Sequence, residues 1–158
     1  MHDLLKFSLC NLQGEFFELS AENGFDSVKF INTFMRSRCA ADLDMEFNRL
    51  QWLGEAYLME EFIDEAGDKL VPGKQYPKGA LFWTGYIYRY WHFLTGESSK
   101  EISKQIKAKD MLCGPPCIQT TAGLIYINDL KEDMKKIIED MVGAGTERAE
   151  RLIKENLR

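Results

Sequence analysis

Two side chains that could do chemistry lie in the most apolar stretch of this 158-residue sequence. Residues 80–94 include seven of the nineteen aromatic residues and only one charged residue, Arg89. His92 follows three positions later, so that both fall on the same side of a helix. A buried guanidinium is costly unless a carboxylate pairs with it. We therefore expect a polar cluster inside an aromatic shell, either as a structural ion pair or as a ligand pocket that Arg89, Tyr90 and His92 face.

The carboxylate that pairs with Arg89 is expected from a long acidic helix over residues 41–66. On the polar side of this helix, Glu55, Glu61 and Asp64 are the natural partners. Several of its acids are spaced four residues apart, and such like-charge pairs destabilise an isolated helix. This spacing indicates a solvated acidic face, or a face that binds a basic group or a partner. The buried side is predicted from apolar residues at helical spacing: Leu43, Phe47, Leu50, Leu53 and Tyr57.

Signals for catalysis are weak. The sequence contains no Gly-x-Ser-x-Gly elbow, no phosphate loop and no dinucleotide fingerprint. Only two histidines are present, so a Cys–His pair would have to use His92. Cys113 and Cys117 are separated by three residues, unlike a thioredoxin-type dithiol, and a metal site there would lack ligands. We expect a non-catalytic protein without cofactor or metal; a small enzyme with a pocket at Arg89 and His92 is the third hypothesis.

The end of the aromatic stretch carries turn and capping signals. Gly96 ends the first helix, and Ser98 with Glu101 forms the capping box of a short helix over residues 99–107. The resulting outline over residues 86–107 is similar to a DNA-binding helix-turn-helix. However, the first helix is too aromatic for an exposed support helix. DNA binding is therefore the alternative hypothesis, in which phosphates would meet Lys100, Lys104, Lys107 and Lys109.

The chain as a whole predicts an all-α fold. We expect a single-domain bundle of about six to seven helices around the central aromatic helix, over residues 1–142, with a helical tail at 143–158. Prolines and glycines exclude helix from a linker at 67–79, and residues 108–123 are expected to be irregular. Residues 124–127 are the one plausible strand. Helices are expected over 3–22, from 27 with a bend near 38–40, and over 41–66, 80–94, 99–107, 129–142 and 146–158.

Composition and charge restrict the class of protein. No run approaches the roughly 20 apolar residues of a membrane span, and the N-terminus has no signal-peptide pattern. We expect a cytoplasmic protein without a membrane partner. The net charge of −5 does not favour binding by phosphate contacts. Residues 41–68 carry nine acids against Arg49 alone, whereas residues 69–110 carry eight bases against three acids. These segments could neutralise each other or present two faces to a partner.

The aromatic stretch also carries a family resemblance. Tyr-Arg-Tyr-Trp-His at 88–92, followed by Thr-Gly-Glu-Ser-Ser-Lys-Glu-Ile at 95–102, resembles a group of small bacterial proteins that look like the antitoxins of toxin–antitoxin gene pairs. Residues 83–87 and the acidic stretch 52–65 are similar too, so the likeness spans about residues 15–110. The chain departs from the group at residues 113–117, where a His-Thr-Leu-Asp-type segment would be expected.

The resemblance implies a protein that neutralises a cognate toxin by direct binding. It transfers no catalytic residues. Segregated charge would speed association with the toxin, and an aromatic anchor would slow release. Association between copies of the chain is a second kind of contact that the C-terminal tail could serve. The residues expected to face a partner or ligand are Arg89, Tyr90, His92, Glu97, Glu61 and Asp64.

Overall fold

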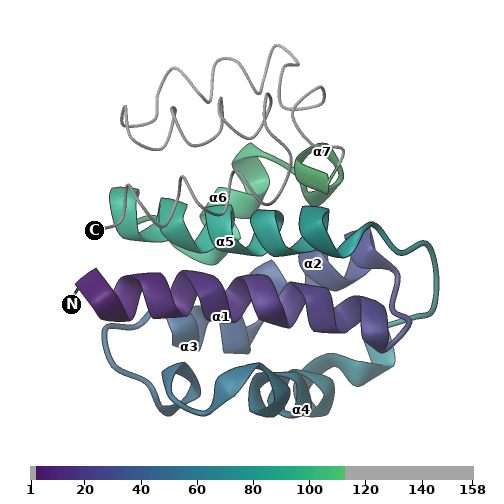
Figure 1. Cartoon of the computed structure of the whole chain (residues 1–158), viewed down its shortest axis with the longest axis horizontal. Coiled ribbons are helices and arrows are strands. Elements are labelled where there is room, and N and C mark those ends of the chain that lie inside the picture. Colours follow the sequence, from purple (N-terminus) through teal and green to yellow (C-terminus); the bar gives the residue numbers. More distant parts are fainter. Residues whose placement is uncertain (1–2, 113–158) are drawn as a thin grey trace.

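The computed structural model describes residues 3–112 and confirms the all-α prediction over them. The expected strand at 124–127, the helices after residue 129, the tail at 143–158 and the loop from Cys113 to Cys117 lie outside the described residues. The helices are α1 Asp3–Glu22, α2 Ser27–Met35, α3 Arg38–Asp44, α4 Gly54–Ala66, α5 Lys78–Thr95, α6 Ser99–Gln105 and α7 Ala108–Leu112, with single 3-10 turns at η1 Arg49–Gln51 and η2 Gly67–Lys69 (Figure 1).

Helices α1 and α5 lie side by side and antiparallel along most of their length (Figure 1). Glycines allow this close approach. A Cβ placed on Gly85 would lie 2.5 Å from the backbone oxygen of Gln13, and one on Gly14 would lie 2.9 Å from the backbone oxygen of Phe82. The side-chain amide nitrogen of Gln13 also donates a hydrogen bond to the Gly85 backbone carbonyl, at 2.9 Å. The predicted aromatic helix is therefore fixed in depth and register by α1.

Replacing Gly85 with alanine is expected to lower the free energy of unfolding by about 2 kcal/mol, because two helix backbones would have to separate. This loss should appear although alanine is intrinsically better in a helix by about 1 kcal/mol. Urea unfolding measures it. Gly67→Ala is the control, since its Cβ would meet only the Ile63 side chain, at 3.3 Å. Equal stability of the two variants would contradict a tight crossing at Gly85.

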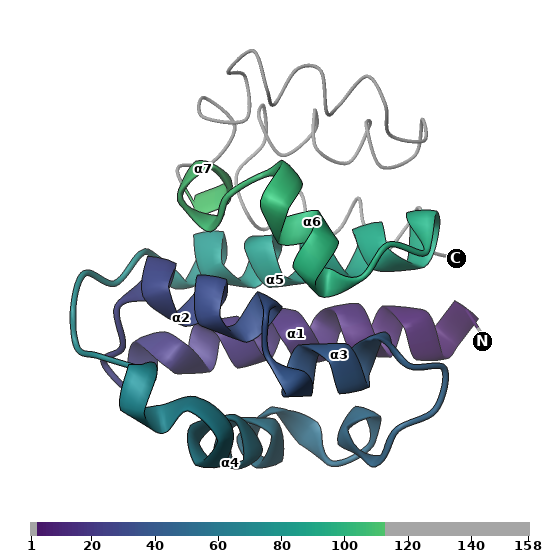
Figure 2. The same ribbon diagram turned by 180° about the vertical axis from the view of Figure 1, so that it is seen from behind.

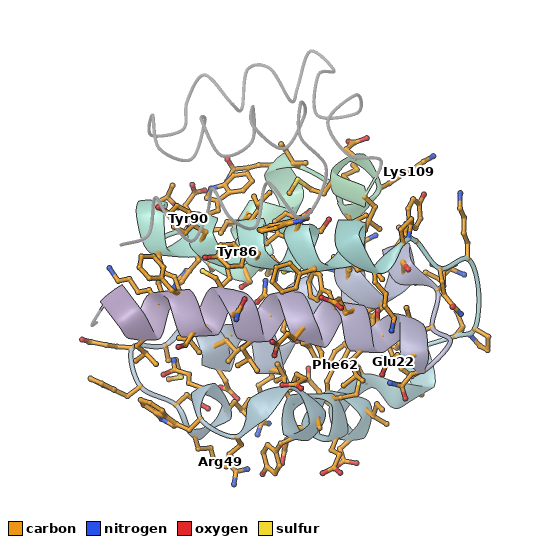
Figure 3. All side chains as sticks on the ribbon, viewed as in Figure 1. Glu22, Arg49, Phe62, Tyr86, Tyr90 and Lys109 are labelled. Atoms are coloured by element: carbon orange, nitrogen blue, oxygen red, sulfur yellow. The ribbon has the colours of Figure 1, made fainter. Side chains whose placement is uncertain are left out.

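An aromatic cluster fills the core between α1, α2 and α4. The Phe16 ring lies 4.7 Å from Phe34 and 5.9 Å from Phe62, measured between centroids. Phe62 also meets Phe30 and Phe34 edge-on, both at 5.3 Å. Figure 2 shows α2 and α3 on one side of α1, and Figure 3 shows Phe62 pointing from α4 toward α1. The amphipathic stripes of three helices thus converge as their spacing predicts.

The predicted helix over 41–66 is wrong. Helix α3 ends at Asp44, the backbone at Met45 is extended, and α4 begins only at Gly54. Asn48 caps the intervening 3-10 turn by accepting from the Leu50 amide, at 3.0 Å, and Gly54 has a φ of 85°. An L side chain rarely adopts that conformation, so the chain turns there. Of the predicted buried stripe, Phe47 and Leu53 are exposed instead.

Several other boundaries also differ from the prediction. The linker at 67–79 was expected to exclude helix, but it contains η2 and the first residues of α5, which begins at Lys78; α6 ends at Gln105 and not at residue 107. The chain breaks at residues 36–37, before the expected bend at 38–40, because the Ser37 side chain caps α3 by accepting from the Ala40 amide. Residues 108–112, expected to be irregular, form α7. The Asp26 side chain caps α2 by accepting from the Lys29 backbone N–H, and the predicted capping box of α6 is confirmed. None of the helices in residues 3–112 is long and apolar enough to span a bilayer.

Candidate functional site

Arg89 lies in a buried polar network that joins four helices. Its side chain is fully enclosed. Nη1 donates to Oδ1 of Asp44 at 2.6 Å, while Nε and Nη2 donate to the amide oxygen of Gln13 at 2.9 and 2.7 Å. Nη2 also donates to the Ser99 hydroxyl, at 3.2 Å. All three guanidinium nitrogens therefore have partners within the protein.

Asp44 is the carboxylate of this network, and the prediction of Glu55, Glu61 or Asp64 for that role is wrong. Besides Arg89, it accepts from the Ser99 hydroxyl at 2.6 Å and from the Ser99 backbone N–H at 2.8 Å. Ser99 is the first residue of α6, so Asp44 also satisfies a free donor at the start of that helix. Asp44 is the last residue of α3. Because the helix ends there, its carboxylate reaches Arg89 of α5 and Ser99 of α6.

His92 and Glu97 lock the turn between α5 and α6. Nδ1 of His92 lies 2.6 Å from the Glu97 backbone oxygen, which can only accept, so Nδ1 carries the hydrogen. The Glu97 carboxylate accepts from the Trp91 indole at 3.3 Å and from the Gln105 amide. Gly96 adopts a φ of 75° within this turn. These side chains therefore fix the α5–α6 angle.

The site residues predicted from the sequence divide into two groups. Arg89, His92 and Glu97 come together, with His92 Nδ1 3.7 Å from Oδ1 of Asp44. Tyr90 lies on the same helix as Arg89 and His92 (Figure 3), and its side chain is buried. Because Arg89 is enclosed and engaged on every nitrogen, the guanidinium forms a structural ion pair and is not open to a ligand. Glu61 and Asp64 of α4 form the second group, which lies apart from Arg89 and beside α3 and η1.

The two cysteines of the described residues are unsuited to nucleophilic chemistry. Burial raises the pKa of Cys10 far above its ordinary value. The pKa of Cys39 is also raised, first by burial and then by its hydrogen bond to Glu65. Both thiols therefore stay protonated, and the thiolate is the form that attacks. No three candidate metal ligands converge within residues 3–112.

Glu61 and Asp64 line a hollow of about 380 Å³ between α3, η1 and α4. Arg49 lies over part of it, 3.7 Å from the Glu61 carboxylate. Figure 3 shows Arg49 at the outer edge on the α4 side. Arg49 thus pairs with one acid of this face, Glu61, within the chain. The full lining is Arg38, Cys39, Asp42, Asn48, Arg49, Leu50, Glu61, Asp64 and Glu65.

Glu65 has a structural role at one wall of the hollow. Its carboxylate accepts from the backbone N–H groups of Arg38 at 2.8 Å and Cys39 at 3.0 Å, at the start of α3. Burial alone would raise the pKa of Glu65, but these hydrogen bonds to the ionised form outweigh it and lower the pKa overall. Glu65 therefore stays charged and holds α3 against α4.

Sequence reasoning missed an exposed apolar segment at residues 45–53. Four of its five large apolar side chains are exposed: Phe47 by 72%, Trp52 by 63%, Met45 by 55% and Leu53 by 50%. Among the other residues whose side chains the structure describes, 5–93 and 95–112, the only exposed large hydrophobic residue is Ile63 on α4. The helix-breaking Asn48 and Gly54 were the signal, because they interrupt a run that otherwise fits a helical stripe.

The apolar segment is held in place although its apolar side chains face solvent. Leu50 is buried at its centre. The buried Gln51 amide donates to the Met45 carbonyl at 2.7 Å, which closes the segment on itself. Asn48 caps the 3-10 turn between them. The segment therefore presents its exposed side chains from a fixed backbone.

A second hollow, of about 420 Å³, carries basic side chains between α2 and α6. Lys104 and Lys107 lie there with Arg36. However, α6 has only seven residues and packs on α2, α3 and α5, with Ser99 and Ile102 buried. The short helix therefore does not project from the molecule as a recognition helix does.

Glu15 of α1 and Glu55 of α4 form a carboxylate pair with a pH-dependent consequence. Partial burial raises the pKa of Glu15, and the charge of Glu55 and a hydrogen bond to it raise the pKa further. A raised folded-state pKa means that this pair stabilises the fold when the pH is below the unfolded pKa. That stabilisation is lost as the pH rises through the folded pKa.

In the unmodified protein, the contribution of Glu15 to Tm should fall as the pH rises above about 4.3, the ordinary pKa of glutamate. We expect this fall to be smaller in the Glu15→Gln variant. The variant keeps a donor toward Glu55 without the charge. Thermal unfolding followed by circular dichroism across this range measures the effect. Glu60→Gln, which removes an exposed acid from α4, is the matched control. A pH profile unchanged by Glu15→Gln but flattened by the control would contradict the coupling.

Comparisons with known proteins identify no relative of this chain. No protein-family model matches the chain, and neither does any curated protein or any solved structure. The resemblance to antitoxins therefore depends on the sequence motifs at residues 83–102 and 52–65.

Proposed function

We propose that this protein is a non-catalytic protein-binding module that neutralises a cognate toxin protein by direct binding, as an antitoxin does. The apolar segment at 45–53 carries the proposal. Exposed aromatic and methionine side chains, gathered in nine residues, are the composition found at the centre of protein interfaces. If the toxin acts inside the cell that produces both proteins, the complex would form in the cytoplasm.

The local geometry suits tight binding for two reasons. Leu50 and Gln51 fix the backbone of the segment before the partner arrives, so less ordering entropy opposes association. Phe47 and Trp52 supply large rigid side chains, the type that most often dominates binding energy. The acids of α4 flank the segment and would attract a partner of opposite charge. Binding would cover the toxin without any reaction at this chain.

Coexpression with the product of the adjacent gene tests the proposal. We expect that product to arrest growth when expressed alone, and this protein to restore growth and copurify with it in a fixed ratio. The control is the same pair with the antitoxin candidate carrying a stop codon early in α1, which should restore nothing. Growth arrest that persists together with no copurified complex would contradict the proposal.

DNA binding is the second candidate. Because α6 packs on α2, α3 and α5, it would use the basic hollow beside α6 and not a projecting recognition helix within residues 86–107. Lys104, Lys107 and Arg36 could meet backbone phosphates there. If they do, affinity for duplex DNA should fall steeply with salt, and Lys104→Gln with Lys107→Gln should weaken it equally for all sequences. No retention of duplex DNA at low salt would eliminate this candidate.

A further inference from the structure

We infer that the partner docks through a basic segment, placing one arginine or lysine side chain in the hollow between α3, η1 and α4 while its apolar side chains cover Phe47 and Trp52. The inference rests on the proposed protein-binding function and specifies its surface and the chemistry of its partner. The hollow and the apolar segment form one continuous surface, because Asn48, Arg49 and Leu50 belong to both. A partner that covers the segment therefore also meets the hollow.

The charge of the hollow selects a cation. Four carboxylates and two guanidinium groups line it, which gives 4 − 2 = 2 excess negative charges. Glu61 is paired with Arg49, and Glu65 is engaged by the start of α3. Within residues 3–112, the side-chain carboxylates of Asp42 and Asp64 make no hydrogen bond or ion pair. These two carboxylates are therefore available to a basic side chain.

The size and the surroundings of the hollow fit a side chain better than a larger charged ligand. Its volume of about 380 Å³ is near the lower end of the roughly 300–1,000 Å³ of small-ligand pockets. The wider stretch 41–68 carries nine acids and one base, which repels phosphates and attracts a basic surface from a distance. The apolar segment adds contact area that a free cation could not use. A basic and apolar stretch of protein meets all three conditions.

The experiment uses the full chain and three synthetic peptides that differ at one position. The probe is acetyl-Leu-Ala-Arg-Ala-Leu-amide, with glutamine or glutamate in place of arginine in the two controls. Amide NMR spectra follow the titration. We expect the arginine peptide to shift the signals of Asp42, Asn48 and Asp64 with those of residues 45–53. The glutamine peptide should bind more weakly at the same residues, and the glutamate peptide should not bind.

Charge-matched variants separate the hollow from the general acidity of the chain. The double variant Asp42→Asn with Asp64→Asn should lower the affinity for the arginine peptide about fivefold, the change expected from the loss of two exposed ion pairs. Glu60→Gln with Asp68→Asn removes the same charge from exposed acids outside the lining and should change affinity by less than about twofold.

Each of the following results would overturn the inference: no binding of the arginine peptide, equal binding of the glutamate peptide, or equal losses in both double variants. Duplex DNA that shifts the same signals would overturn it as well. Its failure is distinguishable from failure of the proposed function. A toxin that is bound and neutralised with unchanged affinity by the Asp42 and Asp64 variant would leave the function standing and place the contact elsewhere. A peptide that binds as described without any toxin complex would leave only the docking surface.

Discussion

Asp44→Ala is expected to lower the free energy of unfolding by about 3–5 kcal/mol, the cost of leaving a buried charge without its partner. Asp44 itself is nearly buried, and the Arg89 side chain it pairs with is fully buried. Its removal also frees two donors of Ser99 at the start of α6. The loss should therefore exceed that of an ordinary surface ion pair, which is about 0–1 kcal/mol. Urea unfolding followed by circular dichroism measures it.

A double-mutant cycle identifies the cause of this loss. Arg89→Met removes the charge that Asp44 compensates, so the double variant Asp44→Ala with Arg89→Met should be less destabilised than the sum of the two single variants. Asp42→Ala is the matched control, because it removes an acid from the same helix without touching Arg89. We expect it to change stability by no more than about 0.5 kcal/mol. Additive losses in the cycle would show that the pair is not coupled.

The sequence predicts the parts of this fold that depend on neighbouring residues. The capping box at Ser98 and Glu101 and the buried aromatic helix are visible in short windows, and the structure confirms both. The need of Arg89 for a carboxylate was also predictable from burial alone. Which acid supplies it was not, because Asp44 is 45 positions away and its place depends on where α3 ends.

The break between α3 and α4 both ends the helix predicted over residues 41–66 and creates the exposed apolar segment at 45–53. Apolar residues at 43, 47, 50 and 53 fit a helical stripe, so a continuous helix was predicted through them. Asn48 and Gly54 break that helix, and the break turns Phe47 and Leu53 outward while Leu50 stays buried. Periodicity cannot distinguish an apolar residue that packs in the core from one that is kept exposed for a partner. Only the tertiary arrangement separates them.

The motif that resembles antitoxins has a structural explanation in this fold. Arg89, His92 and Glu97 hold α5 and α6 together, and Ser99 connects them to Asp44. These residues therefore support the fold. The proposed surface for a partner lies instead at residues 45–53 and beside α4, where the exposed side chains do not support the core. Function is therefore to be sought in residues that contribute little to stability.

Trp52→Ala is expected to weaken binding of the cognate partner about 30-fold or more, because a central tryptophan typically contributes at least about 2 kcal/mol to an interface. The Trp52 side chain is 63% exposed, so its truncation should leave the fold and Tm nearly unchanged. The dissociation constant, measured by calorimetry with the purified partner, gives the effect. Most of the change should appear in the dissociation rate.

Ile63→Ala is the matched control for this measurement. Ile63 is also a large exposed hydrophobic residue, but it lies on α4 outside the apolar segment. Loss of binding in Trp52→Ala alone would place the contact at residues 45–53, whereas equal losses would indicate a non-specific apolar effect. A Trp52 variant that binds and restores growth as the unmodified chain does would show that the partner does not use this segment. Because Trp52 contributes little to the core, such a result could not be attributed to unfolding.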